Sequence, residues 1–545
     1  MNLIQTVDWT ALAPPVIAAA TALAVVLADL FLPENRKRLL GPLALGGLAL
    51  AALSLLPLRA GDRTTFCLTQ DPGLCSYVAD PFTLIIQLLV LGGAFVAALM
   101  SLPDLRPGPE EPGSLPRGEF WFLLLASAAG AALLPAARDL ATLIIALEVA
   151  TLPAYALVGL RRGSRNGPEA ALKFFLTSVT ATAVTLLGIS FVYAGAGSLH
   201  LTEIGTALPG ADPQLATLAE AGVALTLVGF AFKTAAVPFH FWVPDTYLGA
   251  PLPVAGYLSV VGKTAGLAGL ILVITLAFPA FGSLWGPVVA VLAGLTMTAG
   301  NVAALRTRPD APHSAIRLLA WSSVGQAGYL LVPIAAAAHA ADVTVAVGAT
   351  VAYALMYAVV NLGVFAIAVH VARHHPGHRI ADYRGLYAEH PLLALALGFF
   401  LLCLAGLPPG LVGLFAKIVV FRSAVDAGLG VLAVVMALNV VVALYYYLQW
   451  TAILFRAPEA VPEDAAPRPA AAETPEAPTA GTAVGTGPAT PDSPAAAVTT
   501  DTAAALPVRP LAAPLAAAVA LTAGLGILLS GAPQLILRFA SEALL

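Results

Sequence analysis

The sequence predicts an all-α polytopic membrane protein. Of its 545 residues, 59% are hydrophobic and only 10% are charged, and the mean hydropathy is +0.88. Soluble domains contain about 25% charged residues, so a soluble globular protein is excluded. Prolines interrupt two of the long apolar segments, and interrupted helices are tolerated at membrane depth only where they line a polar interior.

Windows of about 20 apolar residues predict fourteen membrane-spanning helices. In chain order, and numbered one to fourteen below, they cover residues 12–32, 39–57, 81–101, 118–135, 139–160, 169–195, 217–237, 253–279, 285–304, 314–336, 343–372, 390–426, 428–455 and 511–530. The first segment has no basic residue before it and is long enough to span, which favours a helix over a cleaved signal peptide. Residues 457–507 are rich in Ala, Pro, Thr and Gly, and this composition predicts a disordered linker before helix fourteen.

The basic residues predict the orientation. With the N-terminus outside, one set of loops carries seventeen arginines and lysines and the other set carries five. The positive-inside rule makes the first side cytoplasmic, and an even number of helices then places both termini outside. Cys67 and Cys75 share the external loop between helices two and three, where the sequence is compatible with either a disulfide or two free thiols.

Helices seven and twelve are predicted to be broken. Pro238 follows Lys233 in AFKTAAVPFHFWVPD, and Pro408 and Pro409 precede Lys417 in AGLPPGLVGLFAKIVVF. Breaks at corresponding positions in two halves indicate inverted repeats, although proline kinks that serve packing alone are an alternative for each break. The predicted domains are residues 1–110 (helices one to three), 111–280 (first five-helix repeat), 281–456 (second five-helix repeat), 457–507 (linker) and 508–545 (helix fourteen).

Charged residues lie deep in the apolar segments. The chain has only five lysines, and four of them, Lys173, Lys233, Lys263 and Lys417, are in predicted helices, as is Glu148 near the middle of helix five. At roughly 2.5–3.5 kcal/mol per charge at a helix centre, five such residues would cost on the order of 13–17 kcal/mol. An ion pair of Glu148 with a lysine on a neighbouring helix, together with water, would offset this cost. Lysine can release its proton when desolvated and arginine cannot, so the pattern favours a proton path.

Two features of this pattern have alternatives. Lys173 is only about one turn inside its helix, where a lysine that extends to the membrane surface is a second interpretation. Polar residues on the same helices would hold water between the charges, or would serve helix packing. They are Thr177, Ser178, Thr180, Ser259, Thr264, Ser322, Ser323, Gln326, Tyr329, Tyr353, Tyr357 and Asn361.

The sequence predicts no cofactor bound by this chain. No Walker loop, dinucleotide fingerprint or cysteine cluster is present. A metal site at His370, His374, His375 and His378 is disfavoured, because no acidic residue or cysteine completes a set of ligands.

Six motifs, in order, resemble the antiporter-like membrane subunits of respiratory complex I. They are ALEVATLPAYALVG, EAALKFFLTSV, FAFKTAAVPFHFWVPDTYLGAP, SVVGKTAGLAGL, AIRLLAWSSVGQAGYLL and GLPPGLVGLFAKIVVF. The likeness runs from about helix three to helix thirteen. Within the family it is most similar to the N subunit of bacterial NADH:quinone oxidoreductase, equivalent to mitochondrial subunit 2. The M subunit has a glutamate at the position of Lys417, and the L subunit has a long amphipathic helix after the bundle.

The resemblance implies a role for each charged residue. Glu148 and Lys233 would form a switching pair that Lys173 modulates, Lys263 would be the central relay, and Lys417 the exit. It also implies a proton-translocating subunit in the bacterial plasma membrane. FMN, iron–sulfur clusters and quinone would be bound by other membrane and peripheral subunits, and no nucleic acid would be involved. Gln326 departs from the family, in which many members have histidine. Because glutamine cannot take up a proton, a protonatable relay is not expected there.

Two competing hypotheses remain from the sequence. The chain could instead be a subunit of a multisubunit Na⁺/H⁺ antiporter, which is similar in sequence and needs no redox partner. At the level of fold alone, it could be an unrelated solute transporter with a central cavity. A row of lysines with one glutamate suits Na⁺ poorly, since hard cations prefer oxygen ligands, and this favours protons.

Overall fold

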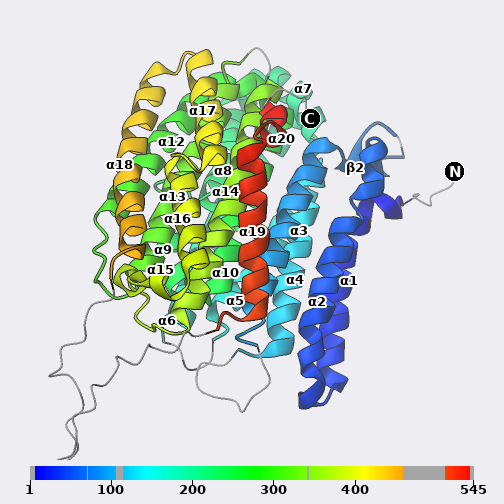
Figure 1. Ribbon diagram of the computed structural model, residues 1–545. Helices are drawn as coiled ribbons and strands as arrows, with labels where there is room; N and C mark the ends of the chain where they lie inside the picture. The colour runs from blue at the N-terminus through cyan, green and yellow to red at the C-terminus, as the bar shows by residue number, and fades with distance from the viewer. Residues whose placement is uncertain are drawn as a thin grey trace, which may run out of the picture.

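The structure is a computed structural model that describes residues 7–69, 71–105, 115–161, 163, 165–340, 343–457 and 510–540. The long helices run side by side along one common direction (Figure 1). Thirteen helices in the described part are long and apolar enough to cross a membrane. The predicted fold class is therefore confirmed. The predicted linker at 457–507 lies, apart from its first residue, outside the described residues.

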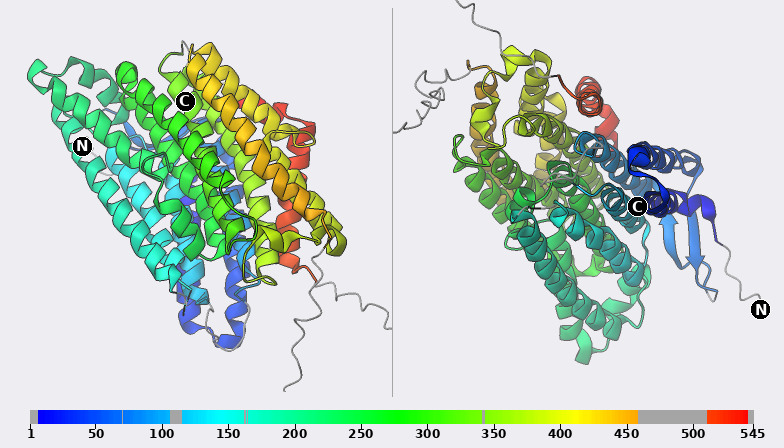
Figure 2. Two further views of the ribbon diagram at one scale, coloured as in Figure 1. Left: turned by 90° about the vertical axis from the view of Figure 1, so that its left-hand side faces the viewer. Right: turned by 90° about the horizontal axis from the view of Figure 1, so that it is seen from below.

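The N-terminal helices lie at one edge of the bundle (Figure 2). They are α1 (Trp9–Phe31), η1 (Glu34–Leu39), α2 (Leu40–Leu53), η2 (Leu56–Ala60) and α3 (Pro81–Ser101). The carboxylate of Asp8 caps α1 by accepting hydrogen bonds from the backbone N–H groups of Thr10 and Ala11, and Asp80 caps α3 in the same way through Thr83.

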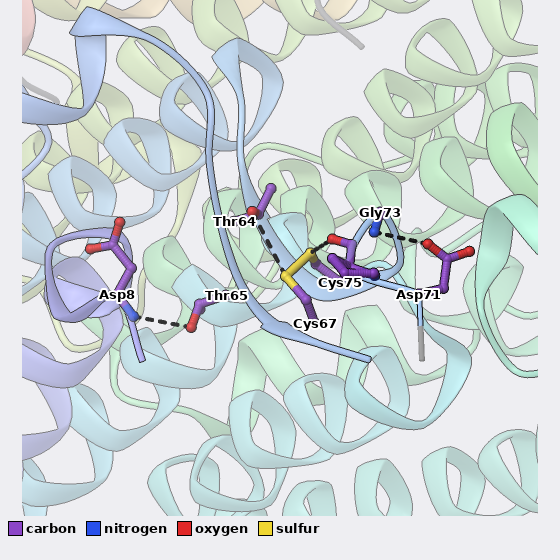
Figure 3. The surroundings of a disulfide bond; sticks show 8 residues. Asp8, Thr64, Thr65, Cys67, Asp71, Gly73 and Cys75 are labelled. Carbon is purple, nitrogen blue, oxygen red and sulfur yellow. Dashed lines mark hydrogen bonds between the residues drawn. A yellow bond between two sulfur atoms is a disulfide. The ribbon is translucent and has the colours of Figure 1, made fainter. Parts of the chain in front are cut away.

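A β-hairpin that the sequence analysis did not predict connects α2 to α3. Its antiparallel strands are β1 (Arg63–Cys67) and β2 (Cys75–Ala79). Cys67 and Cys75 are directly opposite each other in this register and form a disulfide (Figure 3). Of the two alternatives left open by the sequence, a disulfide or two free thiols, the structure therefore shows the disulfide.

The next helices contain the first predicted break. They are α4 (Arg117–Leu133), η3 (Leu134–Ala136), α5 (Leu140–Gly159), α6 (Asn166–Ala196), α7 (Leu201–Ala207), η4 (Leu208–Gly210), η5 (Pro213–Leu215), α8 (Ala216–Lys233), α9 (Trp242–Gly249), α10 (Leu252–Tyr257), η6 (Leu258–Gly262), α11 (Lys263–Leu272) and η7 (Val273–Ala277). Predicted helix seven ends as an α-helix at Lys233, four residues earlier than expected, and the chain resumes as α9 after a non-helical segment. The break is therefore confirmed.

The remaining helices contain the second break. They are η8 (Pro279–Phe281), α12 (Gly282–Leu305), α13 (Ser314–Ala337), α14 (Val343–Ala372), η9 (Ile380–Tyr383), α15 (Leu386–Glu389), α16 (Pro391–Ala405), α17 (Leu411–Asp426), α18 (Gly430–Leu454), α19 (Ala513–Gly531), α20 (Gln534–Leu537) and η11 (Arg538–Ala540). Predicted helix twelve, 390–426, is the interrupted pair α16 and α17. Each of the two is shorter than a full membrane span.

The centre of the bundle consists of α13, α14 and the segment from α10 to η7. In the most apolar window of α13, 94% of residues are buried, compared with 28% in that of α6. Close packing at the centre depends on small residues, because a Cβ at Gly300 of α12 would lie 2.3 Å from the backbone nitrogen of Gly325 on α13. The buried polar side chains of α13 and α14 therefore face protein and not lipid.

Both described ends of the chain lie beside the hairpin. Arg63 of β1 forms an ion pair with Asp8 at 3.0 Å, just before α1. At the other end, Arg538 of η11 lines a crevice together with Arg59 and Gly61, which precede β1. The first and the last described residues thus lie on the same side of the bundle.

Candidate functional site

Lys233 is buried at the C-terminal end of α8, where the first break begins. Its side chain is 4% exposed. Nζ donates hydrogen bonds to Ser178 Oγ at 2.6 Å and to the Tyr155 hydroxyl at 3.3 Å. Glu148 Oε1 is 4.0 Å from the same nitrogen. The structure therefore brings together the predicted pair of Glu148 and Lys233, with Ser178 as the nearer partner of the lysine.

Glu148 lies on α5 between Lys233 and the lateral surface of the bundle. Thr182 donates a hydrogen bond to Oε1 at 2.8 Å. The glutamate side chain is 23% exposed, and Ile145, Val149 and Leu152, near it on the same helix, are between 41% and 61% exposed. The carboxylate is thus held by a polar group on one side and reachable from outside this chain.

Lys173 lies apart from this pair. Its Nζ is 2.8 Å from Glu169 and 2.9 Å from Asp245, and its side chain is 51% exposed. These groups line an open polar cavity of about 200 Å³ together with Asn166 and Arg317. The ion-pair partners of Lys173 are therefore these two surface carboxylates and not Glu148.

Lys263 is the first residue of α11, directly after the π-helical turn η6. Local π-turns are found frequently at functional sites, because they change the direction of the side chains that follow. The lysine is 2% exposed, and its Nζ donates hydrogen bonds to the carbonyl oxygen of Ser323 at 2.5 Å and to its hydroxyl at 2.6 Å. The same hydroxyl is hydrogen-bonded to Tyr357 at 2.8 Å and to Tyr247 at 3.1 Å.

Polar side chains continue along α13 from this point. Gln326, one turn after Ser323, accepts a hydrogen bond from Tyr353 at 2.5 Å and donates one to Tyr447 at 3.2 Å. Tyr447 is also hydrogen-bonded to Ser322 at 2.5 Å. Gln326 is therefore fixed by two tyrosine hydroxyls from two different helices.

Lys417 lies at the second break. It is 5% exposed, and its Nζ donates hydrogen bonds to the carbonyl oxygens of Leu404 and Ala405, both at 2.8 Å. These are among the last carbonyls of α16, which have no partner within the helix and carry its negative dipole end. The ammonium also lies 5.3 Å from the ring centroid of Tyr329, one turn beyond Gln326. Gly406 leaves room for the lysine, because a Cβ there would lie 3.0 Å from Lys417 Cδ.

A small cavity extends from Lys233 toward the turn before Lys263. Its volume of about 20 Å³ is enough for one water, and Thr151, Tyr257 and Gly262 are among its lining residues. The hydroxyl groups of Thr151 and Tyr257, with space for one water between them and Lys233, thus extend the polar surroundings of Lys233 toward Lys263.

For two of the polar residues the structure favours the helix-packing alternative, and it adds several residues that the sequence analysis did not name. Thr180 is exposed and donates to a carbonyl of its own helix, as does Thr177, so neither points into the site. Both belong to α6, whose interior-facing positions at this level include Ser178. The residues missed are Tyr155, Thr182, Tyr247 and Tyr447. Tyr155 could have been found, since it follows Glu148 by two helical turns.

Imidazole rings of the histidine-rich stretch lie close to one another. Among the residues that the structure describes, no group of three or more His, Cys, Asp or Glu side chains is placed to hold a metal ion. The rings of His370 and His374 are 4.9 Å apart between centroids, and those of His370 and His390 are 5.2 Å apart.

Comparison with known proteins identifies the family. Residues 137–443 match the family model described as the transmembrane part of NADH:quinone oxidoreductase and Mrp antiporters. The chain is 65% identical to NADH-quinone oxidoreductase subunit N 2 of Streptomyces griseus, over all of this chain and 95% of that protein. It is 46% identical to NADH-quinone oxidoreductase subunit N of Salinispora tropica, over 85% of this chain and 89% of that protein.

The chain belongs to the family of NADH-quinone oxidoreductase N subunits. It is similar to a chain of respiratory complex I from Thermus thermophilus, with a TM-score of 0.69, 30% identity and coverage of 96% of this chain and 98% of that one. A chain of the Mrp complex from Dietzia has a TM-score of 0.77 at 21% identity, which shows a shared fold alone. The expected family is confirmed. Since N subunits are parts of a larger enzyme, the chain is a membrane subunit of a multisubunit oxidoreductase.

The five charged residues of this N subunit all lie inside the matched region, between residues 137 and 443. Identity over the whole length is with N subunits, whereas the likeness to the Mrp complex is limited to the fold. The Na⁺/H⁺ antiporter hypothesis is therefore not favoured.

Proposed function

We propose that this N subunit moves protons across the membrane through Glu148, Lys233, Lys263 and Lys417. Redox chemistry in other subunits would supply the energy. The observation that carries the proposal is the burial of three lysines, each bonded to uncharged oxygens. A buried lysine that is not hydrogen-bonded to a carboxylate can exist with or without its proton, which is what a relay requires.

The hydrogen bonds suggest the order of the relay. From Glu148, a proton would pass to Lys233, and then through the small cavity lined by Thr151 and Tyr257 toward Lys263. From Lys263, the hydroxyls around Ser323 lead to Gln326 and then to Tyr329, whose ring lies beside Lys417. Gln326 would hold a hydrogen-bonded chain together without binding a proton itself. Lys173, with its two carboxylates, would adjust the field near the cytoplasmic end of the path.

Glu148 also indicates where another subunit binds. A carboxylate in the middle of a membrane helix is costly beside lipid, and this one is 23% exposed among exposed apolar residues of α5. We infer that a neighbouring membrane subunit covers this face. The pairing of Glu148 would then depend on the state of that subunit, which gives a route for coupling.

The remaining features follow from this role. FMN, iron–sulfur clusters and quinone would be bound by other subunits of the complex, and the protein would lie in the bacterial plasma membrane with both termini outside. The breaks after Lys233 and before Lys417 support two inverted repeats, residues 111–280 and 281–456. Each repeat would then contribute one broken helix with one lysine beside it.

Lys263→Ala tests the proposal. In membrane vesicles, we expect this variant to lose most NADH-driven acidification, because no neighbouring group replaces the buried ammonium. Lys37→Ala is the matched control, since Lys37 is outside the proposed relay and forms ion pairs with Asp29 and Glu34 at the end of α1. Assembly is checked by the subunit content of the purified complex. Normal acidification by an assembled Lys263→Ala complex would contradict the proposed relay. Loss of acidification when Na⁺ is replaced by choline would support the Na⁺/H⁺ antiporter hypothesis instead.

A further inference from the structure

A crevice of about 480 Å³ lies between the N-terminal helices and the C-terminal segment. It is lined by the end of α2, by η2, by the first turns of α3 and by η11. Figure 1 shows the C-terminal segment beside the hairpin-side end of α3. The volume is in the range of roughly 300–1,000 Å³ that is typical of small-molecule sites.

Most of the crevice is apolar. Leu56 and Leu88 are 58% and 54% exposed, so the apolar part is open toward the surroundings of the bundle. Its main apolar lining residues are Leu55, Leu56, Leu84, Ile85, Leu88 and Phe539. Such a surface on a membrane protein suits a hydrocarbon chain.

Charged residues lie at the same crevice. Arg59, Asp62 and Arg538 also line it, so the described lining residues carry one more positive than negative charge. Arg538 lies over the ring of Phe539 at 4.9 Å, so its guanidinium adjoins the apolar part. Guanidinium groups bind phosphate through paired, charge-assisted hydrogen bonds.

The crevice is also at the right depth for a lipid headgroup. Arg59 lies between the end of α2 and β1, and the crevice reaches only the first turns of α3. By length and composition, α3 and the segment that contains α2 are long enough to cross a membrane, so we expect their ends on the hairpin side at its boundary. Arginines at the boundary and leucines deeper in the membrane match the two halves of a phospholipid.

We propose that this crevice binds one anionic phospholipid. Its phosphate contacts Arg59 and Arg538, and an acyl chain covers Leu84 and Leu88. The lipid joins the α2–α3 segment to the C-terminal end of the chain, which the crevice separates. This site is independent of the proton path.

The test measures lipid that is retained by the purified complex. The variants are the double substitution Arg59→Gln with Arg538→Gln, the filling substitution Ala52→Phe, and the control Arg422→Gln. Arg422 is 80% exposed on α17 and pairs with Asp426. Each complex is washed in detergent, loaded with phosphatidylglycerol or phosphatidylcholine, washed again, and analysed for lipid by mass spectrometry.

We expect the wild type and Arg422→Gln to retain phosphatidylglycerol in preference to phosphatidylcholine. The double variant should retain roughly tenfold less phosphatidylglycerol, since two charge-assisted contacts are lost. Ala52→Phe should lower retention of both lipids, because the substitution fills the space for the chain. Inorganic phosphate should not displace the lipid, since it lacks the acyl chain. Equal retention by all complexes, or displacement by phosphate alone, would overturn the proposal, as would a cross-link that places another subunit in the crevice.

Discussion

Lys233 and Glu148 are 4.0 Å apart, and each makes a shorter contact with a neutral hydroxyl. Lys233 is 2.6 Å from Ser178 Oγ, and Glu148 is 2.8 Å from Thr182 Oγ1. The two charges are therefore close enough to attract each other but are outside hydrogen-bonding distance. A small side-chain movement would make or break a direct bond, which is the property that a switching pair needs.

The pair predicts different effects for two substitutions of Glu148. Glu148→Gln abolishes the attraction, and Glu148→Asp only lengthens it. We expect acidification to fall by about tenfold or more for the glutamine variant, equivalent to at least about 1.4 kcal/mol, and less for the aspartate variant. Acidification and quinone reduction are measured in the same vesicles. Equal loss in the two variants would rule out an effect of pair geometry.

Lys233→Ala should lower pumping while leaving assembly largely intact. Alanine inserts into the membrane more easily than lysine, and Ser178 and Tyr155 can still bond to each other, as they do at 2.5 Å. Subunit content by immunoblot and acidification by a pH-sensitive dye are measured together. An assembled complex with normal acidification would exclude Lys233 from the relay.

Gln326 predicts a contrast between a polar and an apolar substitution. Gln326→Leu leaves the hydroxyl of Tyr353 without its buried partner, a cost of roughly 1–3 kcal/mol, and breaks the link to Tyr447, which keeps its bond to Ser322. The variant should therefore impair pumping. Gln326→His keeps a hydrogen-bonding side chain and should remain active. Gln87→Leu is the control, since Gln87 is equally buried but bonds to Tyr77 and to a carbonyl outside the path. Full activity of Gln326→Leu would show that the relay does not pass this residue.

The histidines of the loop after α14 predict a pH-dependent opening of that loop. Burial, with His313 and Arg161 nearby, lowers the pKa of His378 from 6.5 to about 4, although Asp382 acts in the opposite direction. The backbone of His378 holds the start of α13, because its carbonyl accepts a hydrogen bond from Ala315 N–H. When the loop opens, the histidine regains its ordinary pKa and binds a proton that the closed loop does not.

The closed loop is therefore fully stable above about pH 6.5, and its stability decreases as the pH falls toward 4. At pH 5.5 the opening constant should be roughly tenfold higher than at pH 7.5. Amide hydrogen exchange of residues 373–385, corrected for the intrinsic effect of pH, measures this constant. In His378→Asn the change should disappear, and an unchanged pH dependence in that variant would assign the effect to another group.

Local signals made most of the bundle predictable. The length of the apolar segments predicted the long helices. Prolines predicted both breaks, because a proline in the interior of a helix removes a hydrogen bond and clashes with the preceding turn. The hairpin was missed, since its strands are only five residues each and lie in a loop with no long alternating pattern.

The site was predictable only in part. Which polar side chains contact the buried charges depends on which face each helix turns toward the bundle interior. Depth and cost predicted that Glu148 pairs with a lysine on a neighbouring helix, and the family resemblance indicated Lys233. Ser178 and Thr180, however, could not be told apart. They are two residues apart on α6, and only packing decides which faces the bundle. The partner of Lys173 could not be predicted either, because Asp245 is 72 residues away in sequence and only the packing of the helices brings the two together.

Lys417 gives the sharpest prediction, because a structural lysine and a relay lysine require opposite results. Its ammonium bonds only to neutral groups, the carbonyls of Leu404 and Ala405 and the ring of Tyr329, among the contacts that the structure describes. Lys417→Arg preserves these contacts and the charge but cannot release a proton. If Lys417 is a relay, this variant should pump almost as poorly as Lys417→Ala.

Lys417→Glu should retain partial activity, since a protonated carboxyl can donate to one of the same carbonyls and can also release its proton. If Lys417 serves packing alone, Lys417→Arg should lower acidification least. Lys417→Glu should lower it most, because an ionised carboxylate would face two carbonyl oxygens. The three variants are compared in one vesicle preparation with assembly checked by immunoblot. Wild-type acidification by Lys417→Arg would contradict the relay at its last step, because a permanently charged guanidinium would then be sufficient.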